Sequence, residues 1–352
     1  MRRTLYILFS AIIVIFIITI VLYPIDNDTT TIADHHTENG FRNPFKGYHE
    51  KSFGDFLFWI LIDRAKNGRE KGPDDINFPV VNNDGKLLKG FHQSPTFTWI
   101  GHSTFLIQVG DINILTDPVW SERASPFSFA GPKRYVRPGL KFNALPDIDI
   151  VIISHDHYDH LDLNTIKKLG NKPLYIVPLG VEERLADIDI TNVESRDWWE
   201  SIEFHSMIIT SVPAQHFSGR TMFDRNSTLW CGWVIQTPGR SIYFAGDTGY
   251  FPGFREIREN FGKIDIAMLP IGAYKPRWFM GPVHIDPVEA VRAYIELDAD
   301  IFIGMHWGTF PLADEEMDEP PRALFEEVDK IGLERSEFNV FKHGESRVFK
   351  LY

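Results

Sequence analysis

The stretch VIISHDHYDHLD, residues 151–162, places three histidines and three aspartates directly after a short apolar run. Such a run is typical of a buried strand, and strand ends that face a common crevice are where α/β proteins assemble their sites. In an extended turn, side chains two residues apart can point the same way, so His155 and His157 can bind one ion. Asp159 and His160 lie just beyond and can reach a second ion. The stretch therefore predicts a metal site at the end of a strand.

Three later apolar runs end in the same kind of side chain. His216 follows MIITSVPAQ, Asp247 follows SIYFAG, and His306 follows DIFIGM. We expect His216 to complete a three-nitrogen set for the first ion, His306 to complete a His2Asp set for the second, and Asp247 to bridge both. Imidazole and carboxylate ligands without thiolate suit zinc, with iron or manganese as alternatives. The sequence therefore predicts two zinc ions per chain, and a buried hydrogen-bonded network without metal is the competing interpretation.

A two-metal site favours hydrolysis. Two divalent ions about 3.5–4 Å apart produce hydroxide from bridging water near neutral pH and stabilise charge on phosphoryl or acyl oxygens. Sequence motifs for serine hydrolases, P-loop enzymes and dinucleotide-binding proteins are absent. We expect Asp159 to act in catalysis as well as in metal binding. Each ligating histidine also needs an acceptor for its second nitrogen, and Asp162 or nearby carbonyls are the candidates.

Composition argues against nucleic-acid binding and against cysteine-based structure. The chain has 36 Lys plus Arg against 48 Asp plus Glu, a net charge of −12, which argues against nucleic-acid binding. Cys231 is the one cysteine, so a disulfide framework and a Cys-based metal cage are both excluded. Hydrophobic residues make up 43% of the chain, enough for a sizeable core.

The N-terminus differs in kind from the rest. After Arg2 and Arg3, the 19 residues from Leu5 to Tyr23 contain no charge, Gly or Pro. As a helix they would span about 28 Å, close to the hydrocarbon core of a bilayer. With no Lys or Arg until Arg42, the positive-inside rule predicts a cytoplasmic N-terminus and a catalytic domain on the non-cytoplasmic side. A cleaved signal peptide and a buried soluble helix are the alternatives.

The remaining pattern predicts three parts. Residues 1–23 form a membrane anchor that contacts the lipid bilayer, 24–93 a linker and N-terminal extension, and 94–352 the catalytic domain. Within the extension, residues 53–62 (FGDFLFWILI) predict a short helix, either docked on the core or lying at a lipid interface. From residue 94, ten short apolar runs alternate with turn signals, with helical windows at 164–170, 253–262, 287–297 and 320–332. This pattern predicts an α/β (α+β) domain of two mixed sheets covered by helices.

These segments resemble the N-acyl-phosphatidylethanolamine-hydrolysing phospholipase D family of the metallo-β-lactamase superfamily. The resemblance covers about residues 94–350 and rests on GHST (101–104), TDPVWSERASPFSFAGPKR (116–134), SHDHYDHLD (154–162), VPLG (177–180), DWWE (197–200), AGDTGY (245–250), PIGAYKPRWFM (270–280), HWGTF (306–310) and KHGESR (342–347). It implies an αββα sandwich with a dinuclear zinc site on the seven ligands given above. It also implies hydrolysis of a membrane phospholipid to N-acylethanolamine and phosphatidic acid. His284, in VHIDP, matches a family histidine near the metals that is implicated in activity.

Several alternatives stay open at this point. The substrate could instead be a lactone, a β-lactam or another small phosphodiester, or the chain could be a scaffold with an inactive site. His284 could contact the substrate phosphate, protonate the leaving alkoxide, or be an ordinary surface histidine. Lys133 and Arg134, with Arg137, could guide an anionic headgroup or be solvated loop charges. Oligomeric state is open, with a homodimer among the alternatives.

Overall fold

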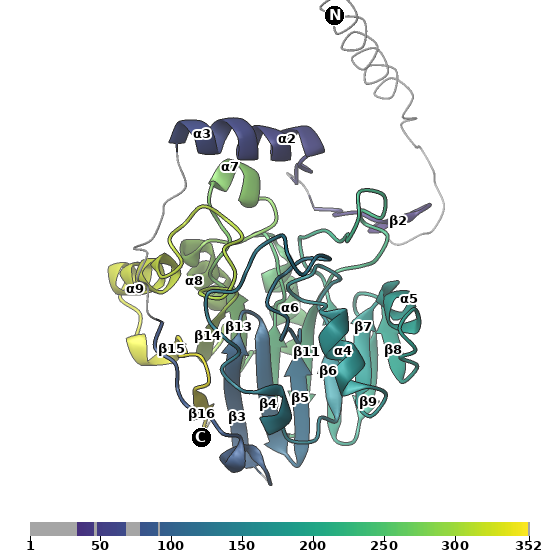
Figure 1. Cartoon of the computed structure of the whole chain (residues 1–352). Helices are drawn as coiled ribbons and strands as arrows, with labels where there is room; N and C mark the ends of the chain where they lie inside the picture. The colour runs from purple at the N-terminus through teal and green to yellow at the C-terminus, as the bar shows by residue number, and fades with distance from the viewer. Residues whose placement is uncertain (1–33, 46–47, 68–77, 91, 351–352) are drawn as a thin grey trace, which may run out of the picture. The chain divides into compact units, whose positions relative to one another are not determined.

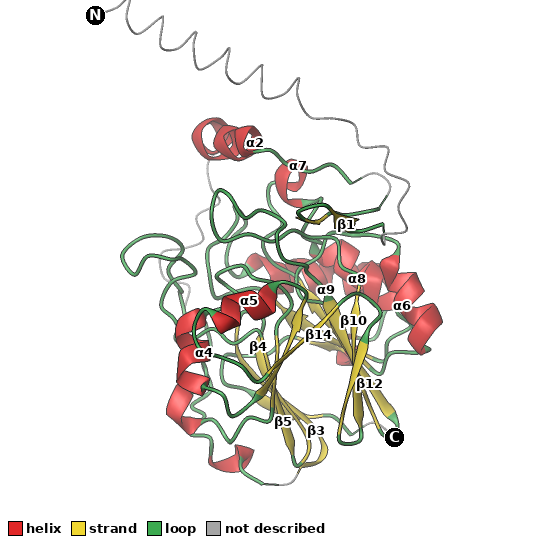
Figure 2. Ribbon diagram, turned by 90° about the vertical axis from the view of Figure 1, so that its right-hand side faces the viewer, coloured by secondary structure: helices red, strands yellow, loops and turns green. Residues whose placement is uncertain are grey.

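The computed structural model describes residues 34–45, 48–67, 78–90 and 92–350. From His35 onward the chain forms one compact unit, in which two seven-stranded sheets face each other and helices cover their outer faces (Figures 1 and 2). The predicted α/β architecture of two mixed sheets covered by helices is therefore confirmed.

The first sheet is mixed, antiparallel from β16 to β5 and parallel from β5 to β8. Its strand order is β16 (Ser346–Val348), β3 (His92–Gly101), β4 (Thr104–Gly110), β5 (Ile112–Thr116), β6 (Ile150–Ile152), β7 (Leu174–Pro178) and β8 (Val193–Arg196). On its outer face lie α4 (Leu163–Leu169) and α5 (Val181–Ala186).

The second sheet repeats this arrangement, antiparallel from β9 to β12 and parallel from β12 to β15. Its strand order is β15 (Phe338–Asn339), β14 (Ile301–Met305), β13 (Ile266–Pro270), β12 (Arg240–Phe244), β11 (Gly232–Thr237), β10 (Met207–Val212) and β9 (Ser201–Phe204). Its outer face is covered by α6 (Gly253–Phe261), α8 (Pro287–Glu296) and α9 (Glu319–Ile331). These helices and α4 agree with the four predicted helical windows to within a residue or two.

Alternation along the central strands builds two hydrophobic layers. In β6, Ile150 and Ile152 join the core between the sheets, whereas Val151 packs in the layer beneath α4 and α5. Successive side chains of a strand point to opposite faces, so a strand that is covered on both sides reads as a continuous apolar run. This explains why the central strands could be predicted from the sequence.

The N-terminal extension packs on the same unit. A hairpin of β1 (His36–Thr37) and β2 (Gly40–Phe41) precedes a helical segment made of α2 (Phe53–Phe58), the π-helical turn η1 (Trp59–Asp63) and α3 (Arg64–Asn67). Trp59 packs against Met280 and Phe279 near the short helix α7 (Arg277–Met280). The 3₁₀ turns are η2 (Lys86–Leu88), η3 (Phe142–Ala144) and η4 (Arg335–Glu337).

The structure contradicts the prediction of a single-pass membrane protein with its catalytic domain on the non-cytoplasmic side. Across the described ranges between residues 34 and 350, every helix is too short or too polar to cross a bilayer. The expected span, residues 5–23, lies outside the described residues. The helical segment at 53–67 is apolar but far shorter than the roughly 20 residues that a span requires.

Candidate metal centre

The seven predicted ligands come together at one end of the sandwich, and both sheets contribute. His155, His157, Asp159 and His160 follow β6 of the first sheet; His216, Asp247 and His306 follow β10, β12 and β14 of the second. The four strands therefore deliver their ends to one place. All seven residues except His157 are buried.

The first predicted set is compact. His157 Nδ1 lies 2.9 Å from His155 Nε2 and 3.3 Å from His216 Nε2. Burial lowers the pKa of His155 and of His216 well below the usual histidine range. These imidazoles are therefore neutral, with lone pairs available, which is the state that a metal requires.

The second predicted set lies beside the first. Asp159 Oδ2 is 3.5 Å from His160 Nε2 and 3.5 Å from His306 Nε2. Burial by itself lowers the pKa of His160, but the carboxylates of Asp247 and Asp159 outweigh it and raise that pKa well above its usual value. The same balance raises the pKa of His306 to about 9. A divalent cation would supply the positive charge that these two rings otherwise take up as protons.

Asp247 lies between the two sets, as the bridging position requires. Its Oδ2 is 3.1 Å from His160 Nε2 and 3.0 Å from His306 Nε2. The same oxygen is 4.0 Å from His155 Nε2 and 3.8 Å from His216 Nε2. Asp247 Oδ1 and the Nε2 atoms of His160 and His306 are buried without a hydrogen-bond partner. Buried polar atoms of this kind are rare unless a ligand satisfies them, so the donor set fits metal ions.

The second nitrogen of several histidines is held by a protein acceptor. His160 Nδ1 donates to Asp117 Oδ2 at 2.6 Å, and Ser154 Oγ donates to the same oxygen at 2.6 Å. His216 Nδ1 donates to the carbonyl of Val283 at 2.9 Å. These bonds leave each Nε2 facing the cluster, which is the usual way proteins orient metal-binding histidines.

Asp162, one of the two expected sources of such acceptors, has a different role. Its carboxylate caps the N-terminus of α4 and accepts from Ser121 Oγ and Thr165 Oγ1 and from the backbone N–H groups of Trp120 and Asn164. The expectation for Asp162 is wrong because its oxygens are used by the helix cap. Asp117 takes that role, and the signal that could have found it is its place after the apolar strand β5.

His102 is a further residue that the sequence did not identify. Its Nε2 donates to Asp159 Oδ2 at 2.9 Å, and its ring lies 3.9 Å from that of His306, centroid to centroid. Burial, together with the neighbouring His306, lowers the pKa of His102 to about 3 despite the contact with Asp159. The neutral ring therefore orients the carboxylate of Asp159.

His284 lies at the rim of the cluster. Its Nδ1 is 3.8 Å from Asp247 Oδ2, and its ring is 5.1 Å from that of His216. The Nδ1 atom has no hydrogen-bond partner, and the side chain is 12% exposed. Burial lowers the pKa of His284 to about 4. The Nδ1 atom is itself buried beside Asp247, so the exposed part of the side chain lies elsewhere on the ring.

The two basic residues proposed for headgroup guidance have other partners. Arg134 donates to the carbonyls of Ser121 and Val119 and lies over the ring of Phe310, 5.0 Å from its centroid. Lys133 pairs with Glu122 at 2.9 Å. Arg134 therefore braces the loop after β5, and neither residue is placed among the metal-binding side chains.

Unusual backbone holds several of these residues. His102, Asp117 and His306 have φ values of 57°, 33° and 60°, and such left-handed conformations cost about 1–2 kcal/mol each for residues with a Cβ. At Gly246, φ is +61° and an added Cβ would lie 2.5 Å from Ser154 Cβ. Only glycine at position 246 therefore allows the turn before Asp247 to pack this closely against Ser154. Strained backbone of this kind is typical of functional sites.

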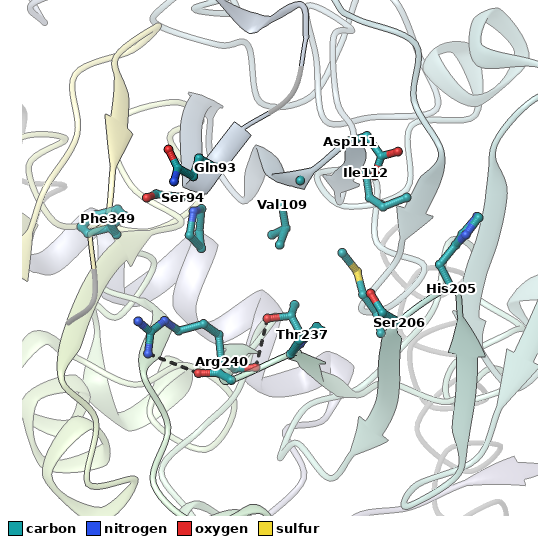
Figure 3. Close-up of a pocket in the computed structure, with 15 residues that line it drawn as sticks. Gln93, Ser94, Val109, Asp111, Ile112, His205, Ser206, Thr237, Arg240 and Phe349 are labelled. Atoms are coloured by element: carbon teal, nitrogen blue, oxygen red, sulfur yellow. Dashed lines mark hydrogen bonds between the residues drawn. The ribbon is translucent and has the colours of Figure 1, made fainter.

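The structure also contains a cavity of about 970 Å³, drawn with its lining residues in Figure 3. It is lined by the turns joining β4 to β5, β9 to β10 and β11 to β12, including Asp111, His205 and Arg240. Because β10 and β12 begin at this cavity and end at His216 and Asp247, the cavity is separate from the metal centre.

Several proteins with similar sequences are named as hydrolases. Residues 112–307 match the family model described as the Beta-lactamase superfamily domain. The chain is 42% identical over 269 residues to N-acyl-phosphatidylethanolamine-hydrolyzing phospholipase D 1 of Caenorhabditis elegans, covering 72% of this chain and 75% of the relative. It is 31% identical to a UPF0173 metal-dependent hydrolase of Methanopyrus kandleri, covering 71% and 97%.

Solved structures show the same fold. The metallo hydrolase Igni18 of Ignicoccus hospitalis superposes with a TM-score of 0.57 at 22% identity, covering 74% of this chain and 100% of its own. At that identity the likeness concerns the fold alone. The sandwich, the cluster of histidines and aspartates, and the matching relatives all agree on one superfamily.

Proposed function

Since the chain belongs to the N-acyl-phosphatidylethanolamine-hydrolysing phospholipase D family of the metallo-β-lactamase superfamily and is a metal-dependent hydrolase, we propose that it hydrolyses the phosphodiester of an N-acylated ethanolamine phospholipid. The products are N-acylethanolamine and phosphatidic acid. We further propose that two zinc ions serve as cofactors, the first on His155, His157 and His216 and the second on Asp159, His160 and His306. Asp247 is their common ligand.

When bound, the two ions supply hydroxide from water at neutral pH and stabilise negative charge on the phosphoryl oxygens. The protein supplies position. His102 holds the carboxylate of Asp159, and Asp117 holds the ring of His160. His284 faces the substrate side and donates a hydrogen bond to a phosphoryl or leaving-group oxygen.

The observation that supports a lipid substrate is an exposed apolar face on the helical segment 53–67. Phe53, Leu61 and Ile62 are 62%, 64% and 53% exposed, which is unusual for large apolar side chains that lie together. Lys51 precedes this face, as expected for a helix that lies on a membrane surface, whereas Arg64 pairs with Asp314 and lies over the ring of Trp59.

This face is physically connected to the metal centre. The ring of Phe58 lies 5.6 Å from that of Trp278 in α7, and Trp59 stacks on Phe279 at 4.8 Å. The α7 residue Met280 accepts the backbone N–H of His284. A lipid held under the helical segment would therefore reach the side of the cluster on which His284 lies.

The proposal is tested by mass-spectrometric product analysis with zinc-loaded protein. Vesicles containing N-acyl-phosphatidylethanolamine should yield N-acylethanolamine and phosphatidic acid, and chelation should abolish the reaction until zinc is restored. Rapid cleavage of a lactone, a β-lactam or a soluble diester by protein that leaves this lipid intact would refute it.

The role of the apolar face is tested by Leu61→Ser combined with Ile62→Ser. Removing two side chains that are more than half exposed should cost about 2–3 kcal/mol of membrane partitioning, on the order of 100-fold. Hydrolysis of vesicles should fall accordingly, while hydrolysis of a short-chain monomeric substrate should not change. Leu87→Ser is the matched control, because Leu87 is 90% exposed but lies on η2.

A further inference from the structure

A second group of metal-binding side chains lies outside the metal centre, where the β1–β2 hairpin meets the turn between β8 and β9. His35 Nε2 is 2.7 Å from Asp197 Oδ1, and His36 Nε2 is 2.7 Å from Asp197 Oδ2. Ligand atoms of the three residues all lie within 4.8 Å of one another. We propose that His35, His36 and Asp197 bind a third divalent cation, which fastens the N-terminal hairpin to the catalytic domain.

The local backbone brings two consecutive histidines onto one carboxylate. Successive side chains in a strand point to opposite faces, but His35 lies in the turn before β1 and His36 is the first residue of β1. The ring of His35 is buried and stacks on Trp198 at 4.1 Å, while the ring of His36 packs edge-on against Phe41 at 5.0 Å. Aromatic contacts therefore fix both rings with their Nε2 atoms directed at Asp197.

The ligand chemistry suits zinc. Two imidazoles and one carboxylate form a common zinc set, with the remaining position filled by water. His36 and Asp197 are 28% and 21% exposed at their side chains, so water can reach that position. Ligand atoms of a tetrahedral zinc lie about 3.4 Å apart, so the 2.7 Å separations need to open by less than 1 Å. His155 and His157 of the main centre lie similarly close, at 2.9 Å.

Asp197 carries the negative charge that a cation site needs. Each of its two oxygens lies 2.7 Å from one histidine Nε2, and its side chain is 21% exposed. The competing interpretation is a purely hydrogen-bonded clamp, in which both imidazoles donate to Asp197 without a cation. Metal content distinguishes the two.

The third site is linked to the main centre through two consecutive residues, Arg42 and Asn43. The backbone N–H of Arg42 donates to the carbonyl of His35 at 2.8 Å. The next residue, Asn43, donates its side-chain N–H to the carbonyl of His216 at 2.6 Å. A cation on His35 and His36 would therefore hold the segment that braces His216, a ligand of the first ion.

The test is elemental analysis of the full-length protein after zinc loading and gel filtration. The wild type and the control His205→Gln should each retain about one zinc per chain more than Asp197→Asn and His36→Gln. His205 is an exposed histidine in the turn between β9 and β10, so it controls for loss of a surface imidazole. Equal zinc content in all four proteins, with folding confirmed by thermal melting, would overturn the proposal. If Asp197→Asn does not fold, His36→Gln decides the comparison, because its ring is partly exposed.

Amide hydrogen exchange provides a readout that is independent of catalysis. Adding zinc to chelated wild-type protein should slow exchange in residues 35–45 at least several-fold, whereas Asp197→Asn should show no such slowing. Zinc-independent exchange of this segment in the wild type would show a hydrogen-bonded clamp only and would refute the third site. Retention of about one zinc by a His157→Ala, His306→Ala double variant would support it.

Discussion

Replacing Asp117 by Asn tests the arrangement behind the metal centre. Asp117 is fully buried and accepts from His160 Nδ1, Ser154 Oγ and the Ser154 backbone N–H, at 2.6, 2.6 and 2.7 Å. An asparagine directs an N–H₂ group at one of these donors, so His160 loses its fixed tautomer and orientation. Loss of such a partner typically lowers metal affinity about 10–100-fold, or about 1.4–2.7 kcal/mol.

The matched control is Asp162→Asn. Asp162 is also buried and lies two residues after His160, but it caps α4 and contacts none of the candidate metal-binding histidines among the described hydrogen bonds. Its replacement should cost about 0.5–2 kcal/mol of stability through loss of the helix cap, with unchanged zinc affinity.

Competition with a fluorescent zinc chelator measures both variants directly. The chelator concentration that removes half of one zinc ion should be at least tenfold lower for Asp117→Asn than for the wild type. For Asp162→Asn it should equal the wild-type value. Urea denaturation of the chelated proteins separates stability from affinity. An unchanged midpoint for Asp117→Asn, or an equal shift for Asp162→Asn, would refute the assignment of Asp117 as the acceptor that orients His160.

Three further outcomes are expected. His284→Ala should lower the turnover rate about 10²–10⁴-fold with unchanged zinc content, because we propose that this side chain contacts the substrate without binding metal; a parallel loss of zinc would contradict this role. Burial lowers the pKa of His343 to about 3. Between pH 3 and 6.5 the His343 ring is therefore protonated in the unfolded chain but not in the folded protein, so the free energy of unfolding falls as the pH drops through that range. The free energy of unfolding, measured by urea denaturation, should fall by about 1.4 kcal/mol through this residue between pH 7.5 and 5.5. His343→Gln should lack this contribution. Asp314→Asn should cost about 1–3 kcal/mol, because Trp59 Nε1 and Arg64 Nε both donate to Asp314; undiminished stability and vesicle hydrolysis would contradict its role in anchoring the helical segment.

Much of the fold was predictable because the central strands are covered on both faces. Each of the ten apolar runs identified in the sequence contains or overlaps a strand of the structure. The four edge strands, β8, β9, β15 and β16, and the hairpin strands β1 and β2 were missed; β8 and β9 show why. Their sequences, VESR and SIEF, are half-exposed and largely polar, so they form strands through pairing with their neighbours and not through a pattern of their own.

The convergence of the candidate ligands was predictable for a different reason. His216, Asp247 and His306 each end an apolar run, and the repetition of that arrangement on several strands pointed to one site. Asp117 also follows an apolar strand, β5, but its histidine partner is not its neighbour in the sequence. That partner, His160, lies 43 residues further along the chain. His102 acts on Asp159 across the core, and a pairing of that kind leaves no local trace in the chain.

The division of the ligands between the sheets has a consequence for how the chain holds together. A cut in the turn between β8 and β9 would give two fragments, one with His155, His157, Asp159 and His160, the other with His216, Asp247 and His306. Neither fragment holds a complete set, and β16 of the second must still pair with β3 of the first. With the proposed ions at this centre, reassembly of the severed halves should therefore require divalent cations, which would connect the two fragments.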